Sequence, residues 1–413
     1  MSAEHEVVVV GGGAAGIAAA RRLRDAGVGV LMVEARTRLG GRAWTTSHGD
    51  AGALDMGCGW LHSADRNPWR GIAESQGRTI DQTPPPWARA TPQPGFPARQ
   101  QAEFRDAFQL FRERLGSFDE KGPDRPASDL LEPLSPWNGL LNAISTYYSG
   151  AELDRVSARD FARYDDDGVN WRVEEGYGSV VAVHGAGLPA RLGCTVQCID
   201  HTGRRLRVET TEGTITADAV ILTLPSNLIA GQAGLFRPAL PEKVEAAAGL
   251  PLGLADKLFM GLSGSEEFAK DSRVFGRTDR AATGAYHFRP FGRPLIEVFF
   301  GGTLAADLEK AGVTAFFDFA MTELVGLYGA GFARRLRPIE VHRWGMDPLA
   351  GGSYSCALPG RAEGRAVLAA PVDNRLFFAG EACSRNDYST AHGAYLTGIA
   401  AADQAIAALR RNP

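Results

Sequence analysis

A glycine-rich segment near the N-terminus carries the first chemical signal in the sequence. Residues Gly11 to Gly16 have the pattern G-x-G-x-x-G, whose glycines permit a tight turn, close approach of a pyrophosphate and close packing of a helix on a strand. Glu34 follows about twenty residues later, the spacing at which a carboxylate accepts hydrogen bonds from a ribose. These residues predict a dinucleotide site with its phosphates at a helix N-terminus, and they leave the choice between NAD and FAD open.

The elements around this motif have the order that it requires. Val7 to Val10 is a continuous apolar strand, residues 14–26 are rich in helix formers, and a second strand runs from Val28 to Val33 after Gly27. This β-α-β unit predicts an α/β fold with a Rossmann-like domain.

Weaker patterns follow along the chain. Residues 83–97 contain six prolines and predict a surface excursion into a second domain, because proline suits neither a helix interior nor a central strand. The spacing of Phe104, Phe108, Phe111 and Leu115 predicts an amphipathic helix. We expect sheet at residues 206–224, a strand at 376–379 and an alanine-rich helix at 393–409.

Composition excludes several classes of protein. The 413 residues exceed the usual size of one domain, and 44% hydrophobic with 22% charged residues is ordinary for a globular chain. A net charge of -4 argues against a nucleic-acid partner. Five scattered cysteines suit a reducing compartment and predict no metal site, and neither a membrane span nor a leader is recognisable. We therefore expect a cytoplasmic protein.

A second glycine and arginine segment, Arg36 to Arg42, could meet the same pyrophosphate. Further motifs occur in order at Asp55–His62, Asp165–Asp167 with Glu175–Ser179, Leu250–Leu262, Trp344–Ser355 and residues 376–398. Together they resemble the flavin-dependent amine oxidase family, which includes monoamine oxidases, polyamine and spermine oxidases and flavin histone demethylases. The motifs are most similar to those of polyamine oxidases.

This resemblance implies a GR2-type, Rossmann-like FAD-binding domain and a discontinuous α+β substrate-binding domain with a mixed sheet. Residues 1–75, 176–236 and 345–413 would form the first, and residues 76–175 and 237–344 the second. The matching positions imply FAD contacts from Gly11, Gly13, Ala15, Gly16, Glu34, Ala35, Arg36, Gly40, Gly41, Arg42, Gly59, Trp60, Val196, Trp344, Gly380, Glu381, Thr390 and Ala391. Ser353 stands where monoamine oxidases have the cysteine that tethers FAD, so we expect non-covalent FAD.

The resemblance also assigns the residues near the reaction. Lys257 matches the flavin-side lysine that holds a water and assists oxygen, and Tyr354 matches one wall of an aromatic cage. The second wall is aromatic in monoamine oxidases but is Thr390 here, as in polyamine oxidases, which widens the site. His62, in a Gly-Trp-x-His context, is either an active-site residue or an ordinary satisfied histidine.

The implied activity is FAD-dependent oxidation of a C–N bond in a primary or secondary amine to an imine, which water hydrolyses, with oxygen reduced to hydrogen peroxide. A polyamine-like substrate is favoured, and Asp165 to Asp167 either attracts a polycation or is a solvated face. The alternatives are an L-amino-acid oxidase or related FAD-dependent dehydrogenase, for which no carboxylate-clamping arginine is identifiable, and a non-catalytic flavoprotein. The sequence leaves the oligomeric state open.

Overall fold

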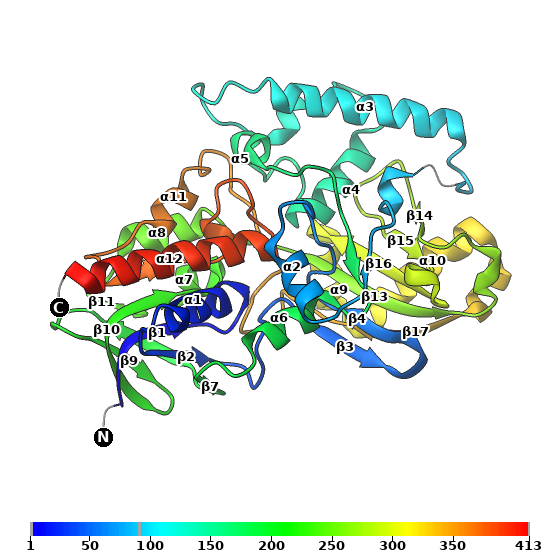
Figure 1. The fold of residues 1–413 in the computed structure, drawn as a ribbon. Coiled ribbons are helices and arrows are strands. Elements are labelled where there is room, and N and C mark those ends of the chain that lie inside the picture. The colour runs from blue at the N-terminus through cyan, green and yellow to red at the C-terminus, as the bar shows by residue number, and fades with distance from the viewer. Residues whose placement is uncertain (1–2, 90–91, 412–413) are drawn as a thin grey trace.

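The structure, a computed structural model, describes residues 3–89 and 92–411. Two sheets form separate lobes that lie side by side, and a group of helices crosses the top of the view in Figure 1. The larger sheet lies on the left with both chain ends, and the smaller sheet lies on the right. The site described below lies between these lobes.

The larger sheet has eight strands in the order β11-β8-β9-β10-β1-β2-β7, with β19 also paired to β10. Its β19-β10-β1-β2-β7 part is parallel, and β8, β9 and the start of β10 form an antiparallel meander. The predicted α/β class with a Rossmann-like unit is confirmed. The strands are β1 (Ala3–Val10), β2 (Val30–Glu34), β7 (Ala190–Leu192), β8 (Val196–Asp200), β9 (Leu206–Thr210), β10 (Gly213–Leu222), β11 (Phe236–Arg237) and β19 (Leu376–Phe378).

Helices cover both faces of this sheet, which explains the unbroken valine run in β1. Val7 and Val9 pack in one core with α1 and α12, while Val8 and Val10 pack in another with α7, α8 and α11. The helices are α1 (Ala14–Asp25), α12 (Ala391–Arg411), α7 (Ser226–Gly231), α8 (Pro241–Ala248) and α11 (Gly364–Ala369). Residues 241–248 therefore pack with the larger sheet, although the sequence analysis grouped residues 237–344 with the second domain.

Two glycines allow the helices to approach the motif closely. A Cβ on Gly16 would lie 1.9 Å from the backbone oxygen of Gly11, and one on Gly398 would lie 2.2 Å from that of Ala15. Both distances are far below van der Waals contact, so only glycine fits at either position. The last glycine of G-x-G-x-x-G thus acts in packing, as its position predicts.

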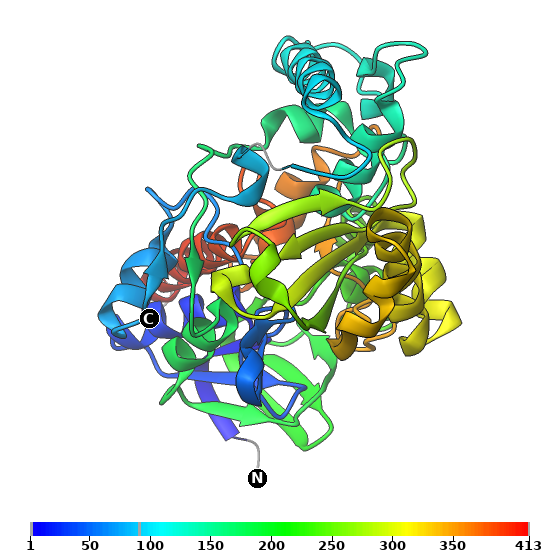
Figure 2. The ribbon, with the colours of Figure 1, turned by 90° about the vertical axis from the view of Figure 1, so that its right-hand side faces the viewer.

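The smaller sheet has five strands in the order β14-β15-β16-β13-β17 and faces the viewer in Figure 2. Its described pairs are all antiparallel, and short connections of the kind that antiparallel pairing permits join β14 to β15 and β15 to β16. The expected mixed pairing occurs in the larger sheet instead. The strands are β13 (Ala255–Leu262), β14 (Ser272–Phe275), β15 (Ala285–Phe288), β16 (Leu295–Gly301) and β17 (Leu336–Val341).

The two faces of the smaller sheet carry different residues. Even-numbered side chains such as Leu258, Val298 and Tyr286 pack with α9 (Gly302–Ala311) and α10 (Val313–Tyr328). The odd-numbered side chains point to the opposite face, because successive residues of a strand alternate. We call this opposite side the cavity face; from β13, β14, β15 and β16 it carries Lys257, Phe259, Arg273, Phe275, Ala285, His287, Glu297 and Phe299.

The remaining elements connect and cover the two sheets. The helix predicted from the phenylalanine spacing is confirmed as the longer α3, and it packs over α5. The hairpin of β3 and β4 packs on the smaller sheet through Leu54, Phe259 and Leu295. These elements are α2 (Pro68–Ser75), α3 (Ala98–Gly116), α4 (Asn138–Ser149), α5 (Ala158–Arg163), α6 (Tyr177–Gly185), β3 (Thr45–His48), β4 (Gly52–Asp55), β5 (Ile80–Asp81), β6 (Arg172–Val173), β12 (Leu252–Gly253) and β18 (Tyr354–Ser355).

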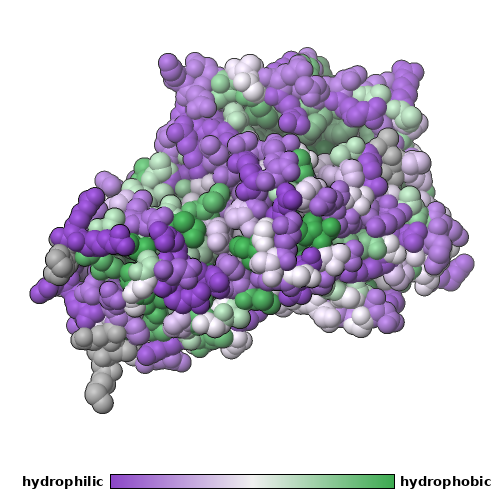
Figure 3. Space-filling model, viewed as in Figure 1, coloured by the Kyte–Doolittle hydropathy of each residue, from purple (hydrophilic) through white to green (hydrophobic). Residues whose placement is uncertain are grey.

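The surface adds little to the functional argument. The face shown in Figure 3 is mainly hydrophilic with scattered apolar patches. Within residues 3–89 and 92–411, no helix has the length and apolar character needed to cross a bilayer. No group of three or more His, Cys, Asp or Glu in that part of the chain could hold a metal ion.

A buried ion pair joins α5 to α11. Arg365 donates to both carboxylate oxygens of Asp160, at 2.6 and 2.7 Å, and both side chains are 1% exposed. Asp160→Ala would leave a buried guanidinium unpaired, so we expect a loss of about 3–5 kcal/mol in the free energy of unfolding. The exposed pair Arg361–Glu245 is the control, and Glu245→Ala should cost less than about 1 kcal/mol. Urea unfolding measures both, and equal losses would contradict the assignment.

Candidate functional site

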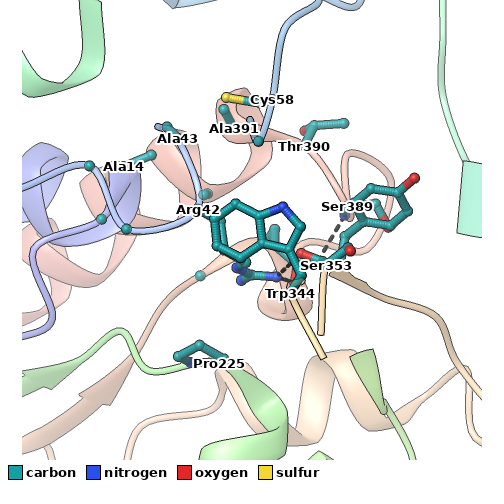
Figure 4. A pocket seen from close by; sticks show the side chains of 18 of the residues that line it. Ala14, Arg42, Ala43, Cys58, Pro225, Trp344, Ser353, Ser389, Thr390 and Ala391 are labelled. Carbon is teal, nitrogen blue, oxygen red and sulfur yellow. Dashed lines mark hydrogen bonds and ion pairs between the residues drawn. The ribbon is translucent and has the colours of Figure 1, made fainter. Parts of the chain in front are cut away.

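A single cavity of about 530 Å³ extends from the glycine motif to the cavity face of the smaller sheet. One end is lined by the end of β1, the start of α1 and the end of β2, and the other by aromatic and charged side chains from α4, β13, β14 and β15. Figure 4 shows the middle of this cavity, where the indole of Trp344 lies between Arg42, Ser353 and Thr390. A cofactor and a substrate could therefore meet in one space.

The glycine end has the geometry of a phosphate site. Gly11 has φ +104°, and a Cβ there would lie 2.5 Å from the hydroxyl of Thr223. Gly13 pairs with Gly40 of the second glycine segment, and both line the cavity at the N-terminus of α1. Two glycine segments thus present backbone to the same place, where helix N–H groups favour an anion. These residues fit the pyrophosphate of FAD.

Glu34 is held at the end of β2 by backbone donors. The amide of Gly12 donates to Oε2 at 2.6 Å and that of Arg36 donates to Oε1 at 2.7 Å. The carboxylate is 7% exposed and lines the cavity. Because each carboxylate oxygen can accept more than one hydrogen bond, Glu34 can still accept from a ribose while it orders both glycine segments.

Arg42 and Glu381 form an ion pair that links the second glycine segment to the C-terminal motif. Their N–O distance is 2.9 Å, and Arg42 also donates to the backbone oxygen of Ser353 at 2.7 Å. Burial favours the neutral acid, but Arg42 and the hydroxyl of Ser355 hold the pKa of Glu381 below its usual value. Trp344 is fixed beside them by a bond from its indole N–H to Met56 O, 3.0 Å. Arg42, Ser353 and Trp344 of this group lie at the centre of Figure 4.

Lys257 lies on the cavity face and is 6% exposed. Its Nζ donates to the backbone oxygen of Asp55 at 2.8 Å, forms a 3.1 Å ion pair with Glu297 and lies 5.2 Å from the ring centre of Phe299. Glu297 was not among the predicted site residues, although a glutamate inside the apolar run of β16 is a signal that a buried cation faces it. Lys257 is thus a buried, paired cation.

Glu297 belongs to a larger buried charge network. Arg172 contacts Glu297 at 3.3 Å and Asp271 at 3.3 Å, and His287 approaches both carboxylates. Burial opposes ionisation of Glu297, but Lys257, His287 and Arg172 hold its pKa far below the usual range. Trp60 of the cavity lies against this network, with Arg172 4.8 Å from its ring centre.

Tyr354 and Thr390 both line the cavity. The hydroxyl of Tyr354 donates to the backbone oxygen of Tyr147, and burial raises the pKa of Tyr354, so the phenol stays neutral. Thr390 Oγ1 donates to Asp387 O at 2.6 Å and accepts from the amide of Gly393 at 2.9 Å, which caps the start of α12. The Thr390 hydroxyl therefore bonds to the backbone, and this position adds no aromatic ring to the cavity lining.

His62 also lines the cavity, and burial lowers its pKa although Asp166 opposes the shift. Its Nδ1 lies 2.5 Å from Oδ1 of Asn170. Because an amide oxygen accepts, Nδ1 carries the proton of the neutral ring, and Nε2 is the acceptor. Asp166 is half-buried and reaches His62 electrostatically, whereas Asp165 and Asp167 are exposed.

Most predicted contacts surround this cavity. Its lining includes Gly11, Gly13, Ala15, Glu34, Ala35, Arg36, Gly40, Gly41, Arg42, Gly59, Trp60, Val196, Trp344, Gly380, Glu381, Thr390 and Ala391. Gly16 lies behind the loop. A second set of lining residues was not predicted, because its members come from segments with no recognisable motif: Trp87, Tyr147, Tyr148, Tyr164, Arg273, His287 and Phe299.

Two family models match the chain. Residues 88–406 match the model described as flavin containing amine oxidoreductase, and residues 9–74 match an NAD(P)-binding Rossmann-like domain.

Individual relatives extend this likeness over the whole chain. Polyamine oxidase 4 of Oryza sativa subsp. japonica is 29% identical over 96% of this chain and 88% of its own length. Lysine-specific histone demethylase 1 homolog 2 of Arabidopsis thaliana is 28% identical over 98% of this chain and 58% of its own length. Among solved structures, wild-type putrescine oxidase bound to putrescine has a TM-score of 0.80 at 17% identity and covers 98% of this chain and 100% of that one. At that identity the likeness shows a shared fold.

The surroundings of Ser353 predict how FAD is attached. Its hydroxyl accepts from the amide of Ala255 at 2.8 Å and donates to the oxygen of Ala255 at 3.0 Å, and a hydroxyl is not the thiolate that a thioether requires. Burial raises the pKa of the cavity-lining Cys58 to about 12, which keeps that thiol protonated. We expect acid precipitation to release all flavin colour into the supernatant. Colour that stays with the pellet would contradict this expectation.

Proposed function

The chain belongs to the family of flavin containing amine oxidoreductases, and from this premise we propose that it oxidises a C–N bond of a primary or secondary amine and passes the electrons to oxygen. FAD, when bound, accepts a hydride equivalent from the carbon beside the nitrogen. Water then hydrolyses the imine, and oxygen becomes hydrogen peroxide. The observation that supports this most directly is the continuity of the FAD cradle with the wall that carries Lys257 and Tyr354.

The residues of the substrate end suit a neutral amine. An alkylammonium has a pKa near that of lysine, about 10.4, yet the nitrogen lone pair must be free for oxidation. Trp60, Tyr354 and Phe299 give this end an aromatic lining, which disfavours the charged form by desolvation. The neutral His62 can accept the departing proton or a hydrogen bond at Nε2. The protein thereby orients the amine and removes its proton.

The identity of the amine is the finer part of the proposal. The names of the relatives and the non-aromatic Thr390 support a polyamine-like substrate. Asp166 adds a negative charge near His62 but lies outside the cavity lining. Arg273, in contrast, adds a positive charge to the lining, which favours a substrate with an anionic end.

An anaerobic screen tests the proposed activity. We expect amines to bleach the flavin absorbance without oxygen, and peroxide to appear in equal amount to the aldehyde or ketone when oxygen is admitted. L-Amino acids serve as the comparison series for the alternative oxidase activity. If no amine bleaches the flavin, amine oxidation is excluded, and preference for an L-α-amino acid would support the alternative.

Lys257 provides a residue-level prediction. A preorganised donor that stabilises developing charge on oxygen contributes about 10²-fold or more to rate, so Lys257→Met should slow flavin reoxidation by that factor. The measurement is stopped-flow mixing of anaerobically reduced enzyme with oxygenated buffer. Because this change also removes one of the cations that pair with Glu297, the double variant Lys257→Met/Glu297→Gln separates loss of the donor from loss of that pairing. The exposed Lys310→Met is the control, and wild-type reoxidation in both Lys257 variants would refute the role.

A further inference from the structure

The register of the smaller sheet places a row of charged residues across the substrate end of the cavity. Arg273 pairs with His287 across β14 and β15, and His287 pairs with Glu297 across β15 and β16. Residues directly opposite one another in an antiparallel sheet project to the same face. Arg273 and His287 both line the cavity, on the same face as Lys257.

Arg273 differs from the other cations of this face because it has no acid to pair with. Lys257 is paired with Glu297, and His287 lies 3.2 Å from Asp271. Among residues 3–89 and 92–411, no carboxylate lies within ion-pair distance of Arg273, whose contact is the ring of Phe275 at 4.6 Å. Burial lowers the pKa of Arg273 to about 10, which still leaves it charged at neutral pH. A desolvated, unpaired guanidinium in a cavity calls for an anionic ligand.

The carboxylates that line the cavity lie far from Arg273, at its cofactor end. The carboxylates that line it in the described chain, Glu34 and Glu381, are both at the cofactor end and both hold backbone or arginine donors. Asp166, outside the lining, accepts from the amide of Gly168. A second ammonium on a substrate would therefore meet Arg273 and His287 at the far wall, where the described part of the lining has tyrosine hydroxyls but no carboxylate.

The separation of these groups sets the shape of the ligand. Arg273 is on β14 and Lys257 is on β13, three strands away in the sheet. At about 4.8 Å between neighbouring strands, the backbones of these two residues are about 14 Å apart. An α-amino acid has its carboxylate on the reacting carbon and is too short to use both ends. A flexible amine with an acid at its far end matches this separation.

We propose that the substrate is an ω-amino carboxylate, or a secondary amine with a carboxylate arm, whose carboxylate is bound by Arg273 while its amine lies beside Lys257 and Tyr354. This assignment rests on the proposed amine oxidation and narrows its substrate class. The planar fork of arginine can donate two parallel hydrogen bonds to a carboxylate, which lysine cannot reproduce. Arg273 is then a specificity residue, remote from the bond that is oxidised.

Matched probes test this proposal. Hexylamine, hexamethylenediamine and ε-aminocaproate share one chain length, and their butyl and octyl homologues vary the reach. We expect ε-aminocaproate or its octyl homologue to bleach the flavin at least about tenfold more efficiently than the monoamine or diamine of the same length, since one charge-assisted pair is of that order. Arg273→Gln should abolish this preference, and Arg273→Glu should reverse it toward the diamine. Arg277→Gln, an exposed arginine just beyond β14, is the charge-matched control and should behave as wild type.

A binding measurement gives a readout separate from turnover. Adipate carries carboxylates but no amine, and it should raise the melting temperature of the wild type and of Arg277→Gln but not of Arg273→Gln. If diamines exceed the amino acids in the wild type, or if Arg273→Gln leaves both the preference and the adipate shift unchanged, the proposal is overturned while amine oxidation stands. If no probe bleaches the flavin, the proposed activity fails, and the adipate shift alone decides whether Arg273 binds an anion.

Discussion

Strand alternation in β13 is the constraint on which the site depends. Side chains on a strand point by turns to opposite faces, so Leu258 and Met260 enter the core beneath α9 and α10 while Lys257 enters the cavity. The neighbouring antiparallel strands also alternate between core-facing and cavity-facing side chains. A register shift of one residue in a strand would move its core-facing side chains into the cavity and its cavity-facing side chains into the core. The apolar core on the far side of the sheet therefore fixes which side chains the substrate meets.

The alternation places charged side chains on the buried cavity face of the smaller sheet. Each of these ions, if unpaired, would lower the stability of the fold by several kcal/mol through loss of its hydration. The protein offsets that cost by pairing: Lys257 with Glu297, Glu297 with Arg172, and Arg172 with Asp271. Removing one member would weaken the pairing of its neighbours, and this mutual dependence gives the wall a defined arrangement. Arg273 stands at the end of the same wall outside this pairing, and for that reason its charge is available to a ligand.

The two lobes act as one unit because hydrogen bonds cross between their sequence segments. The indole of Trp344 reaches Met56 while its amide reaches Asp256, and Lys257 reaches the backbone oxygen of Asp55. Trp344 thus ties β13 to the segment that follows β4. The cofactor cradle and the substrate wall come from different sheets, yet these contacts hold them around one cavity.

The sequence by itself determined the cofactor half of this protein. The cofactor motifs act through backbone geometry and local spacing, which can be recognised in the sequence without knowledge of the fold. They are G-x-G-x-x-G, Glu34 and the Arg36–Arg42 segment. The valine run of β1 likewise predicted a continuous apolar strand, and the structure buries that strand on both faces. Only the tertiary structure decided the substrate half. The partnership of Lys257 with Glu297, and the position of Arg273 opposite His287, depend on strand register between segments far apart in the chain, and no local pattern encodes that register.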